Sequence, residues 1–257
     1  MGKSIVITSG KGGVGKTTLA SALGLALAEM NYRVVLIDAD FTLNNLDIVL
    51  GVECSVVYDI TDVVKGKCRL WEALIKYPYS ENLFLLPSAH TLTDELDLKG
   101  FVNIANELKR NSDYLLIDCP AGIDLGFHRA LSVSEEALVV VTPTITALRD
   151  ADKVIGLLDS YGLRGVGIVV NRARGDLILE GECPSPREIS KLLRTALMGC
   201  IPEDDNALLM YSNRDTDYMQ AVYMLALTLT GKRKQVFDVT KKYKGVLGAI
   251  RRSLKNL

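Results

Sequence analysis

A glycine-rich stretch near the N-terminus constrains the fold of this chain more than any other feature. Residues 10–18 read GKGGVGKTT and match the pattern G-x-x-x-x-G-K-[ST]. The stretch directly follows the apolar residues 5–7, so it lies between an expected buried strand and an expected helix. Glycines let the backbone turn tightly and direct its N–H groups at an anion, because no Cβ blocks the approach. The sequence therefore predicts a polyphosphate site in a strand, loop and helix unit.

Two side chains of this loop have chemistry that suits a nucleotide. Lys16 supplies a positive charge for the β- and γ-phosphates, and Thr17 offers a hydroxyl to Mg²⁺. The helix that begins near residue 15 adds the positive end of its dipole. A glycine-rich turn with a surface lysine is the alternative, which the flanking strand and helix disfavour. The predicted nucleotide-binding residues of the loop are Gly10, Lys11, Gly12, Gly13, Val14, Gly15, Lys16, Thr17 and Thr18.

Composition narrows the class of protein and its compartment. The chain has 257 residues, of which 48% are apolar and 24% charged, an ordinary globular balance that allows a sizeable core. Since it contains no run of 18 apolar residues and no signal peptide, we expect a cytoplasmic body. The five cysteines are scattered and never spaced as C-x-x-C, so neither a disulfide framework nor a zinc site is expected.

Strand and helix patterns alternate along the chain. Such alternation is typical of a parallel sheet covered by helices on both faces. The expected strands are 5–7, 33–37, 83–86, 114–118, 137–141 and 165–170, and the expected helices are 16–30, 56–64, 69–75, 99–110, 147–161 and 218–230. The predicted fold is therefore α/β: a single-domain P-loop NTPase over residues 1–231, with a mostly parallel twisted sheet flanked by helices.

Carboxylates follow two of these strands. Asp38 and Asp40 come at the end of the strand 33–37, and Asp118 ends the strand 114–118. Because ligands of parallel sheets bind beyond the carboxyl ends of the strands, these side chains are expected to face the phosphate loop. Asp118 is predicted to reach Mg²⁺ through water, and Gly122 to turn its N–H toward a γ-phosphate. Capping of a turn is the alternative for Asp38 and Asp40.

Lys11, directly after the first glycine, gives the loop an unusual form. With this lysine the loop resembles the deviant Walker A motif of the MinD/ParA family of P-loop ATPases, and the DAD…NLD residues 38–47 resemble its first switch region. The resemblance implies that Lys11 crosses a dimer interface to the partner's nucleotide; a solvated lysine beside a phosphate site is the alternative. It also implies that Asp40 orients the attacking water and that Asp38 supports the Mg²⁺ shell. Lys11, Lys16 and Asp40 become the expected catalytic residues, and Thr17, Asp38 and Asp118 the expected metal site.

The same resemblance suggests where the base lies. In the family an asparagine at the end of a late strand contacts the adenine, which gives this role to Asn171; a strand-end cap is the alternative. The segment 201–204 resembles the family's second base-side loop. The expected residues on the base side are Asn171, Arg172, Pro202, Glu203 and Asp204.

The last 26 residues differ in charge from the rest of the chain. Residues 232–257 contain nine Lys or Arg and a single Asp, a net charge of +8; since the whole chain carries −1, residues 1–231 carry −9. The apolar residues of this tail share one stripe of a helix, the pattern of an interfacial membrane helix. A terminal helix packed on the body is the alternative. The expected membrane contacts are Tyr243, Val246, Leu247, Ile250 and Leu254.

Taken over the whole chain, the resemblance is to the branch of the family that selects the site of cell division. It implies Mg²⁺-dependent hydrolysis of ATP to ADP, a homodimer held by ATP, and reversible attachment to anionic lipids on the inner face of the cell membrane. It also implies a MinC-like inhibitor and a MinE-like activator as partners, and no nucleic acid. A DNA-partitioning or flagellar-placement ATPase, or a nucleotide-binding scaffold without turnover, remain alternatives. Residues 180–184 and the GAIRRS core of the tail do not match the family pattern.

Overall fold

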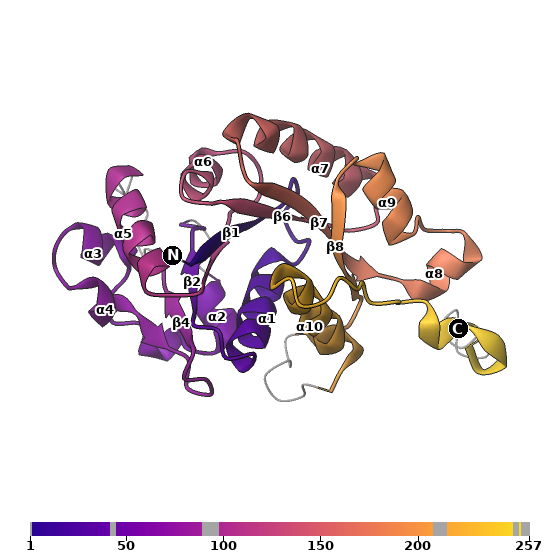
Figure 1. Cartoon of the computed structure of the whole chain (residues 1–257), viewed down its shortest axis with the longest axis horizontal. Coiled ribbons are helices and arrows are strands. Elements are labelled where there is room, and N and C mark those ends of the chain that lie inside the picture. The colour runs from indigo at the N-terminus through magenta and orange to yellow at the C-terminus, as the bar shows by residue number, and fades with distance from the viewer. Residues whose placement is uncertain (1, 42–44, 89–97, 208–214, 249–251, 253–257) are drawn as a thin grey trace.

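One twisted sheet of eight strands forms the centre of the molecule (Figure 1). The computed structural model describes residues 2–41, 45–88, 98–207, 215–248 and 252. The strand order is β3-β4-β2-β5-β1-β6-β7-β8, and all neighbours are parallel except the antiparallel pair at the β3 edge. The strands are β1 (Lys3–Thr8), β2 (Val34–Asp38), β3 (Ile75–Lys76), β4 (Leu83–Leu86), β5 (Tyr114–Asp118), β6 (Glu136–Val141), β7 (Gly165–Ala173) and β8 (Ala196–Pro202).

Helices cover both faces of the sheet, as the alternation in the sequence predicts. The helices are α1 (Lys16–Glu29), α2 (Leu46–Leu50), α3 (Ile60–Val64), α4 (Leu70–Ala73), α5 (Leu98–Arg110), α6 (Leu125–Leu131), α7 (Ile145–Leu158), α8 (Gly175–Glu180), α9 (Pro186–Leu192) and α10 (Asp217–Leu229), with short 3₁₀ turns η1 (Glu53–Ser55), η2 (Asp159–Tyr161) and η4 (Lys241–Tyr243). None of the helices in the described part of the chain is long and apolar enough to cross a bilayer.

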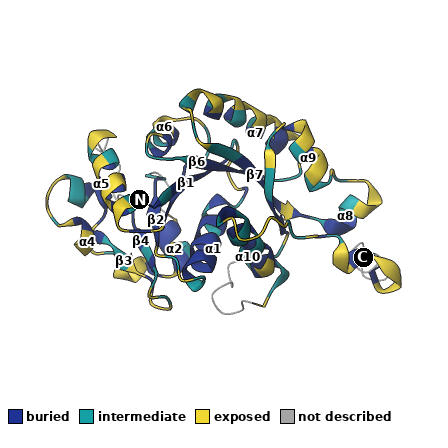
Figure 2. Cartoon of the chain, in the orientation of Figure 1, coloured by how far each residue is buried: buried dark blue, intermediate teal, exposed yellow. Residues whose placement is uncertain are grey.

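Two apolar layers hold the sheet between the helices. Side chains alternate across a strand, so Val6 packs in one layer while Ile5 and Ile7 pack in the other. Helices α1, α2 and α10 cover the layer of Ile5, and α3 to α7 with α9 cover the layer of Val6. Figure 2 shows the strands buried and the outer sides of the helices exposed. Strands buried on both faces explain the continuous apolar runs in the sequence.

The sheet order brings the ends of three strands together. Strand β5 lies between β1 and β2, and the register sets Asp118 opposite both Ile7 and Asp38. The phosphate loop leaves β1 directly after Thr8, on the same edge of the sheet. The fold class predicted from the sequence is confirmed, and the topology explains why carboxylates 80 positions apart in the chain meet.

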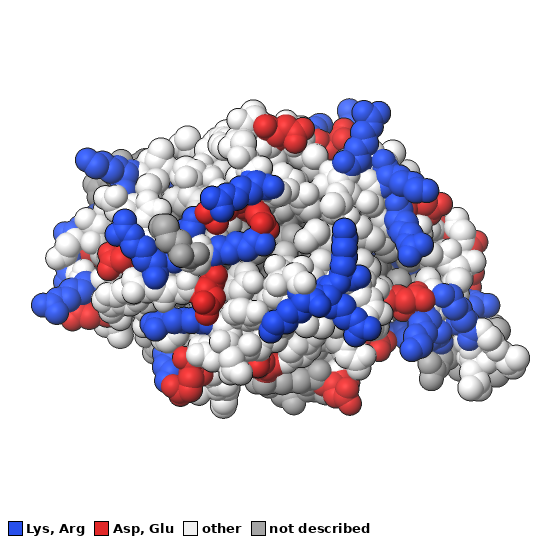
Figure 3. Space-filling view, viewed as in Figure 1, with Lys and Arg blue, Asp and Glu red and all other residues white. Residues whose placement is uncertain are grey.

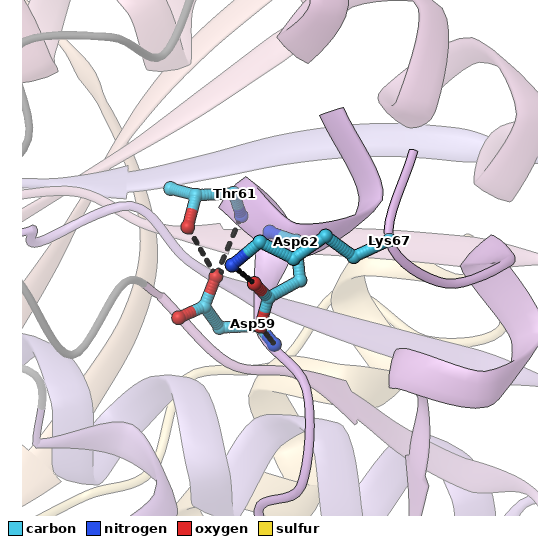
Figure 4. Close-up of polar contacts among 4 residues, drawn as sticks. All are labelled: Asp59, Thr61, Asp62 and Lys67. Carbon is cyan, nitrogen blue, oxygen red and sulfur yellow. Dashed lines mark hydrogen bonds and ion pairs between the residues drawn. The ribbon is translucent and has the colours of Figure 1, made fainter. Parts of the chain in front are cut away.

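Several elements differ from the sequence prediction. The strands β3 and β8 and the helices α2, α6, α8 and α9 have no counterpart in it. The helix expected over 56–64 begins only at Ile60, because the Asp59 side chain accepts hydrogen bonds from the backbone N–H groups of Thr61 and Asp62 and so caps its first turn (Figure 4). Lys67 closes this turn by an ion pair with Asp62 at 2.7 Å.

The chain after α10 packs on the body before it reaches the end of the tail. Val239 and Tyr243 are buried, and a Cβ at Gly175 of α8 would lie 2.0 Å from the Val239 carbonyl oxygen. Tyr243 therefore departs from the expected membrane stripe, because it lies in the 3₁₀ turn η4 and packs inward. Helix resumes at residues 245–248, where Val246 and Leu247 are 81% and 77% exposed.

Two of the expected membrane contacts cannot be placed. Ile250 and Leu254 lie outside the described residues. Beyond residue 248 the structure describes Arg252, whose Nε lies 3.7 Å from a carboxylate oxygen of Glu180 in α8. Lys and Arg side chains also gather on the face that carries the segment after α10 (Figure 3). The division of the chain at residue 231 stays a prediction.

Candidate nucleotide site

The phosphate loop joins β1 to α1 and needs glycine at defined positions. Gly13 and Gly15 have φ of +75° and +92°, the left-handed region that glycine adopts without strain. A Cβ at Gly10 would lie 2.3 Å from the backbone carbonyl carbon of Asp150 in α7, and one at Gly15 would lie 2.6 Å from the Asn171 side-chain nitrogen. The loop is thus held tightly by α7 on one side and by the end of β7 on the other.

Asn171 fixes the loop through one buried hydrogen bond. Its Nδ2 donates to the Val14 carbonyl at 2.8 Å, and the residue is 4% exposed. This contact differs from the two roles considered from the sequence, adenine contact and strand-end cap. Because the residue also lines the cavity on the base side, its contact with adenine stays a prediction.

Asp38 and Asp118 form a crowded pair of buried carboxylates. Each is 2% exposed, and they are opposite one another in the register of β2 and β5. Burial, together with the charge of Asp118, raises the pKa of Asp38 well above its ordinary value. Burial raises the pKa of Asp118 to about 7, although a hydrogen bond from Thr17 and the charge of Lys16 act in the opposite direction. The pair is a region of unfavourable negative charge that a cation would relieve.

The two carboxylates are bonded differently. Asp38 accepts from the backbone N–H of Asp40 at 2.9 Å and from that of Leu46 at 3.1 Å, so both of its oxygens shape the loop after β2. Asp118 Oδ1, in contrast, is buried and has no hydrogen-bond partner among the described residues. An orphaned carboxylate oxygen beside Thr17 suits a hydrated Mg²⁺. The turn-capping role considered for Asp38 is present as well.

A cavity of about 550 Å³ opens over the phosphate loop. Asp40 lines it, opposite the loop residues predicted to hold the phosphates. Gly122, at φ +94°, lies in the loop after β5, and its N–H donates to the Ser9 carbonyl over a long 3.4 Å. The lining residues are Gly12, Gly13, Gly15, Lys16, Thr17, Thr18, Asp40, Asn45, Ile48, Val49, Cys119, Pro120, Ala121, Asp124 and Arg172.

A second cavity of about 360 Å³ continues from the first toward β8. The two share Gly15, Thr18 and Arg172, so they adjoin one another. Arg172 has φ +54° at the irregular end of β7, which places it between the two halves. The lining residues are Gly15, Thr18, Asn171, Arg172, Pro202, Glu203, Asp204, Asp205, Ala207 and Tyr218. All five residues predicted for the base side meet here.

Lys11 contacts α7 rather than the lining of either cavity. Its Nζ donates to the Thr146 hydroxyl at the start of α7 at 3.3 Å, and its side chain is exposed. Lys11 lines neither half of the site. The lysine that makes the motif unusual therefore has a different position from Lys16, which is buried at the base of the loop.

The structure also adds residues that the sequence does not single out. Tyr218, in the first turn of α10, lines the base-side cavity from a position 47 residues beyond Asn171. Ile48 and Val49 of α2 line the phosphate side. No motif marks these positions, since they reach the site only through the packing of α2 and α10 on α1. In the described part of the chain, no three His, Cys, Asp or Glu side chains converge to hold a metal by themselves.

Comparisons with known proteins indicate the family of this chain. Residues 2–162 match the family described as an AAA domain. A putative septum site-determining protein MinD from Guillardia theta is 42% identical over 98% of this chain and 97% of its own length. The septum site-determining protein MinD of a Synechocystis strain is 38% identical over 99% of both chains.

Solved structures show the same relationship. The MinC:MinD cell division protein complex of Aquifex aeolicus matches with a TM-score of 0.83 and 40% identity, over 90% of this chain and 96% of that one. The Pyrococcus horikoshii MinD complexed with Mg-ADP matches with a TM-score of 0.80 and 33% identity, over 91% and 100% of the chains. A ParA family ATPase from Chlorobium tepidum, at 21% identity, shares the fold.

The phosphate loop, the paired carboxylates and the sheet order define a P-loop ATPase. Within that class, the family of this chain follows from its relatives, because they match it over nearly the whole length of both chains. The chain belongs to the MinD family of septum site-determining ATPases. The resemblance inferred from Lys11 and the switch residues is confirmed, as is the enzyme class.

Proposed function

We propose that this chain is a Mg²⁺-dependent ATPase that dimerises on ATP and binds the inner face of the cell membrane reversibly, where it helps to position cell division. The observation that carries the proposal is the position of Lys11. Lys11 extends outside its own nucleotide site, beside α7, where a second copy could meet it. A lysine that does not serve its own phosphates is available to those of a partner.

The residues of the phosphate side fit a Mg²⁺ nucleotide. Lys16 and the loop N–H groups would hold the phosphates, while Thr17 and Asp118 would hold the metal, with Asp38 shaping the loop beside them. The support is the orphaned, buried Asp118 oxygen and the crowded carboxylates. When bound, Mg²⁺ supplies charge neutralisation for the transferring phosphoryl group. The relative from P. horikoshii is complexed with Mg-ADP.

Asp40 is the residue that we assign to the attacking water. It lines the phosphate-side cavity, and its backbone N–H is held by the buried Asp38 carboxylate. Catalysis of phosphoryl transfer depends on positioning and on charge stabilisation more than on covalent chemistry. Asp40 would orient the water, and the Lys11 of a partner would add positive charge at the γ-phosphate. One copy alone would therefore hydrolyse ATP slowly.

The C-terminal tail supplies the membrane contact in this proposal. Val246 and Leu247 are exposed at its first helical turn, close to Lys242 and Lys244. These lysines pair with Asp217 and Asp238 at the surface, and such pairs contribute only about 0 to 1 kcal/mol, so anionic lipid can compete for them. A single tail binds weakly, whereas two tails held by an ATP-bound dimer gain affinity from their effective concentration.

The partners follow from the relatives and from the resemblance. The A. aeolicus relative was solved as a MinC:MinD complex. We extend a MinC-like inhibitor to this chain because 40% identity over most of both chains accompanies the shared fold. A MinE-like activator that stimulates hydrolysis completes the proposed cycle.

The test compares dimerisation and lipid binding in ATP and in ADP. Light scattering with Mg-ATP should show a dimer for the wild type and a monomer for Lys11→Ala, while Lys191→Ala, a change of an exposed lysine on α9, should still dimerise. Vesicles containing phosphatidylglycerol should sediment the wild type with ATP only. A Lys11→Ala protein that dimerises normally would contradict the proposal. ATP-dependent retention on DNA without vesicle binding would favour the DNA-partitioning alternative.

A further inference from the structure

Tyr218 is a buried polar residue in the wall of the base-side cavity. It is 3% exposed, lies in the first turn of α10, and lines the cavity together with Asn171, Pro202 and Asp204. Its hydroxyl has no hydrogen-bond partner among the described residues. A buried hydroxyl without a partner is costly, so proteins rarely keep one without a reason.

The charged group that affects Tyr218, Asp204, does not hydrogen-bond to this hydroxyl. Burial, together with the charge of Asp204, raises the pKa of Tyr218 above its ordinary value. The Asp204 Oδ1, however, accepts from the backbone N–H of Asn206 at 2.9 Å and holds its own loop in shape. Tyr218 therefore brings an unpartnered hydroxyl donor to the residues that line this cavity, among them the acceptor Asp204.

This arrangement matches the hydrogen-bonding edge of adenine. The ring nitrogens of adenine accept hydrogen bonds, and its exocyclic amine donates them. Tyr218 offers a donor, and the lining carboxylates Glu203, Asp204 and Asp205 offer acceptors. Since the hydroxyl is already out of water, it has no hydration to lose when a base fills the cavity.

We propose that Tyr218 recognises the base of the bound nucleotide, with its hydroxyl donating to a ring nitrogen of the adenine. The inference rests on the proposed placement of the adenine in this cavity, and it adds a residue that no motif of the sequence contains. Tyr218 also packs in the apolar layer with α1, the helix that follows the phosphate loop. The same side chain thus contacts the base cavity and supports the helix behind the phosphates.

The test is Tyr218→Phe, which removes the hydroxyl and keeps the ring. Titrations of the full chain with Mg-ADP and with Mg-pyrophosphate separate the base from the phosphates. We expect ADP to bind about 3- to 10-fold more weakly, the value of one hydrogen bond, and pyrophosphate to bind within about twofold of the wild type. The nucleotide-free variant should melt no lower than the wild type, because the hydroxyl that it loses has no partner among the described residues.

The matched control is Tyr223→Phe, the same change on the same helix at a residue that does not line the cavity. It should leave the affinity for both ligands unchanged. Unaltered ADP affinity in Tyr218→Phe would overturn the inference and leave nucleotide binding intact. A lower melting temperature with equal loss for ADP and pyrophosphate would show a structural hydroxyl and would also overturn it. A wild type that binds ADP no more tightly than pyrophosphate would overturn the placement of the base itself.

Discussion

The phosphate loop and the C-terminal tail are held by opposite means. Close backbone contacts at Gly10 and Gly15 and a buried hydrogen bond from Asn171 fix the loop before any ligand arrives. The tail after Tyr243, in contrast, exposes Val246 and Leu247, and a surface ion pair joins its Arg252 to Glu180 of α8. Preorganisation suits the part that binds charge and positions a reaction. A weak hold suits the proposed exchange of the tail between the protein surface and a membrane.

The largest effect on nucleotide affinity and hydrolysis should come from removal of the positive charge of Lys16 at the base of the loop. Lys16→Ala removes the buried ammonium that faces the phosphates, and we expect ADP affinity and ATP hydrolysis to fall by about 100-fold or more, in the range measured for a group that stabilises phosphoryl charge. Calorimetric titration and phosphate release measure the two losses. An active Lys16→Ala protein would remove the phosphate loop from the mechanism.

The addition of a single Cβ atom at Gly10 should disrupt the close packing of the loop. Gly10→Ala would place a Cβ 2.3 Å from the carbonyl carbon of Asp150, so we expect a loss of stability of about 2 kcal/mol or more, with loss of nucleotide binding. The control is Gly156→Ala in α7, where a Cβ would meet nothing within 4 Å and the helix should gain about 0.5 to 1 kcal/mol. Denaturant unfolding compares the two, and equal stability would show that the loop is loosely held.

Substitution of Asp118 should change ligand binding and stability in opposite directions. Because burial raises its pKa to about 7, the folded state holds this proton more tightly than the unfolded state, and its ionisation lowers the free energy of unfolding as the pH rises from about 4 to about 7. Asp118→Asn should therefore melt a few degrees higher than the wild type at about pH 7.5 without nucleotide, with a smaller difference at about pH 5. It should also lose the extra ADP affinity that Mg²⁺ gives.

Thermal unfolding with and without Mg-ADP checks both expectations for Asp118. The matched variant Asp124→Asn changes the carboxylate that caps α6 and also lines the phosphate-side cavity. It should retain the response to Mg²⁺. An Asp118→Asn protein that still gains affinity from Mg²⁺ would contradict the assignment of the metal.

The smallest effect on stability should come from the exposed side chain of Leu247 in the tail, and the buried Tyr243 serves as the comparison. Tyr243→Ala empties a buried position and should cost about 2 to 4 kcal/mol, whereas Leu247→Ser alters an exposed side chain and should stay within about 0.5 kcal/mol. For lipid binding we expect the reverse order. Leu247→Ser should weaken binding more than Tyr243→Ala, because it removes an exposed apolar side chain that a vesicle would cover. Vesicle sedimentation of Leu247→Ser at the wild-type level would place the membrane contact elsewhere.

The sequence is most informative where chemistry is local. The loop 10–18, Asp38 and Asp118 are each marked by their position after an apolar strand, and the register of β2 and β5 places the carboxylates as expected. Strand β8 is not predicted because Gly199 interrupts its apolar run. Gly199 has its reason in packing, since a Cβ there would lie only 3.2 Å from the Leu225 side chain of α10. Contacts of this kind depend on the tertiary structure.

Side chains that act across long separations in the chain could not be predicted. The bond from Asn171 to Val14 joins residues 157 positions apart, and Tyr218 reaches the base cavity only because α10 packs on α1. Tyr243 follows the helical period of the tail and yet turns inward, since η4 ends that period before the exposed turn begins. Periodicity describes one element at a time and carries no information on its neighbours.

The end of β7 links nucleotide and tail over a very short piece of chain. Asn171 holds the phosphate loop, and four positions later Gly175 receives the backbone of Val239 and the ring of Tyr243. Between them Arg174 binds Asp176 and lies 3.8 Å from Glu203 of the base side. Because these contacts lie within five consecutive residues, we expect a substitution in this run to affect both the phosphate loop and the packing of the tail.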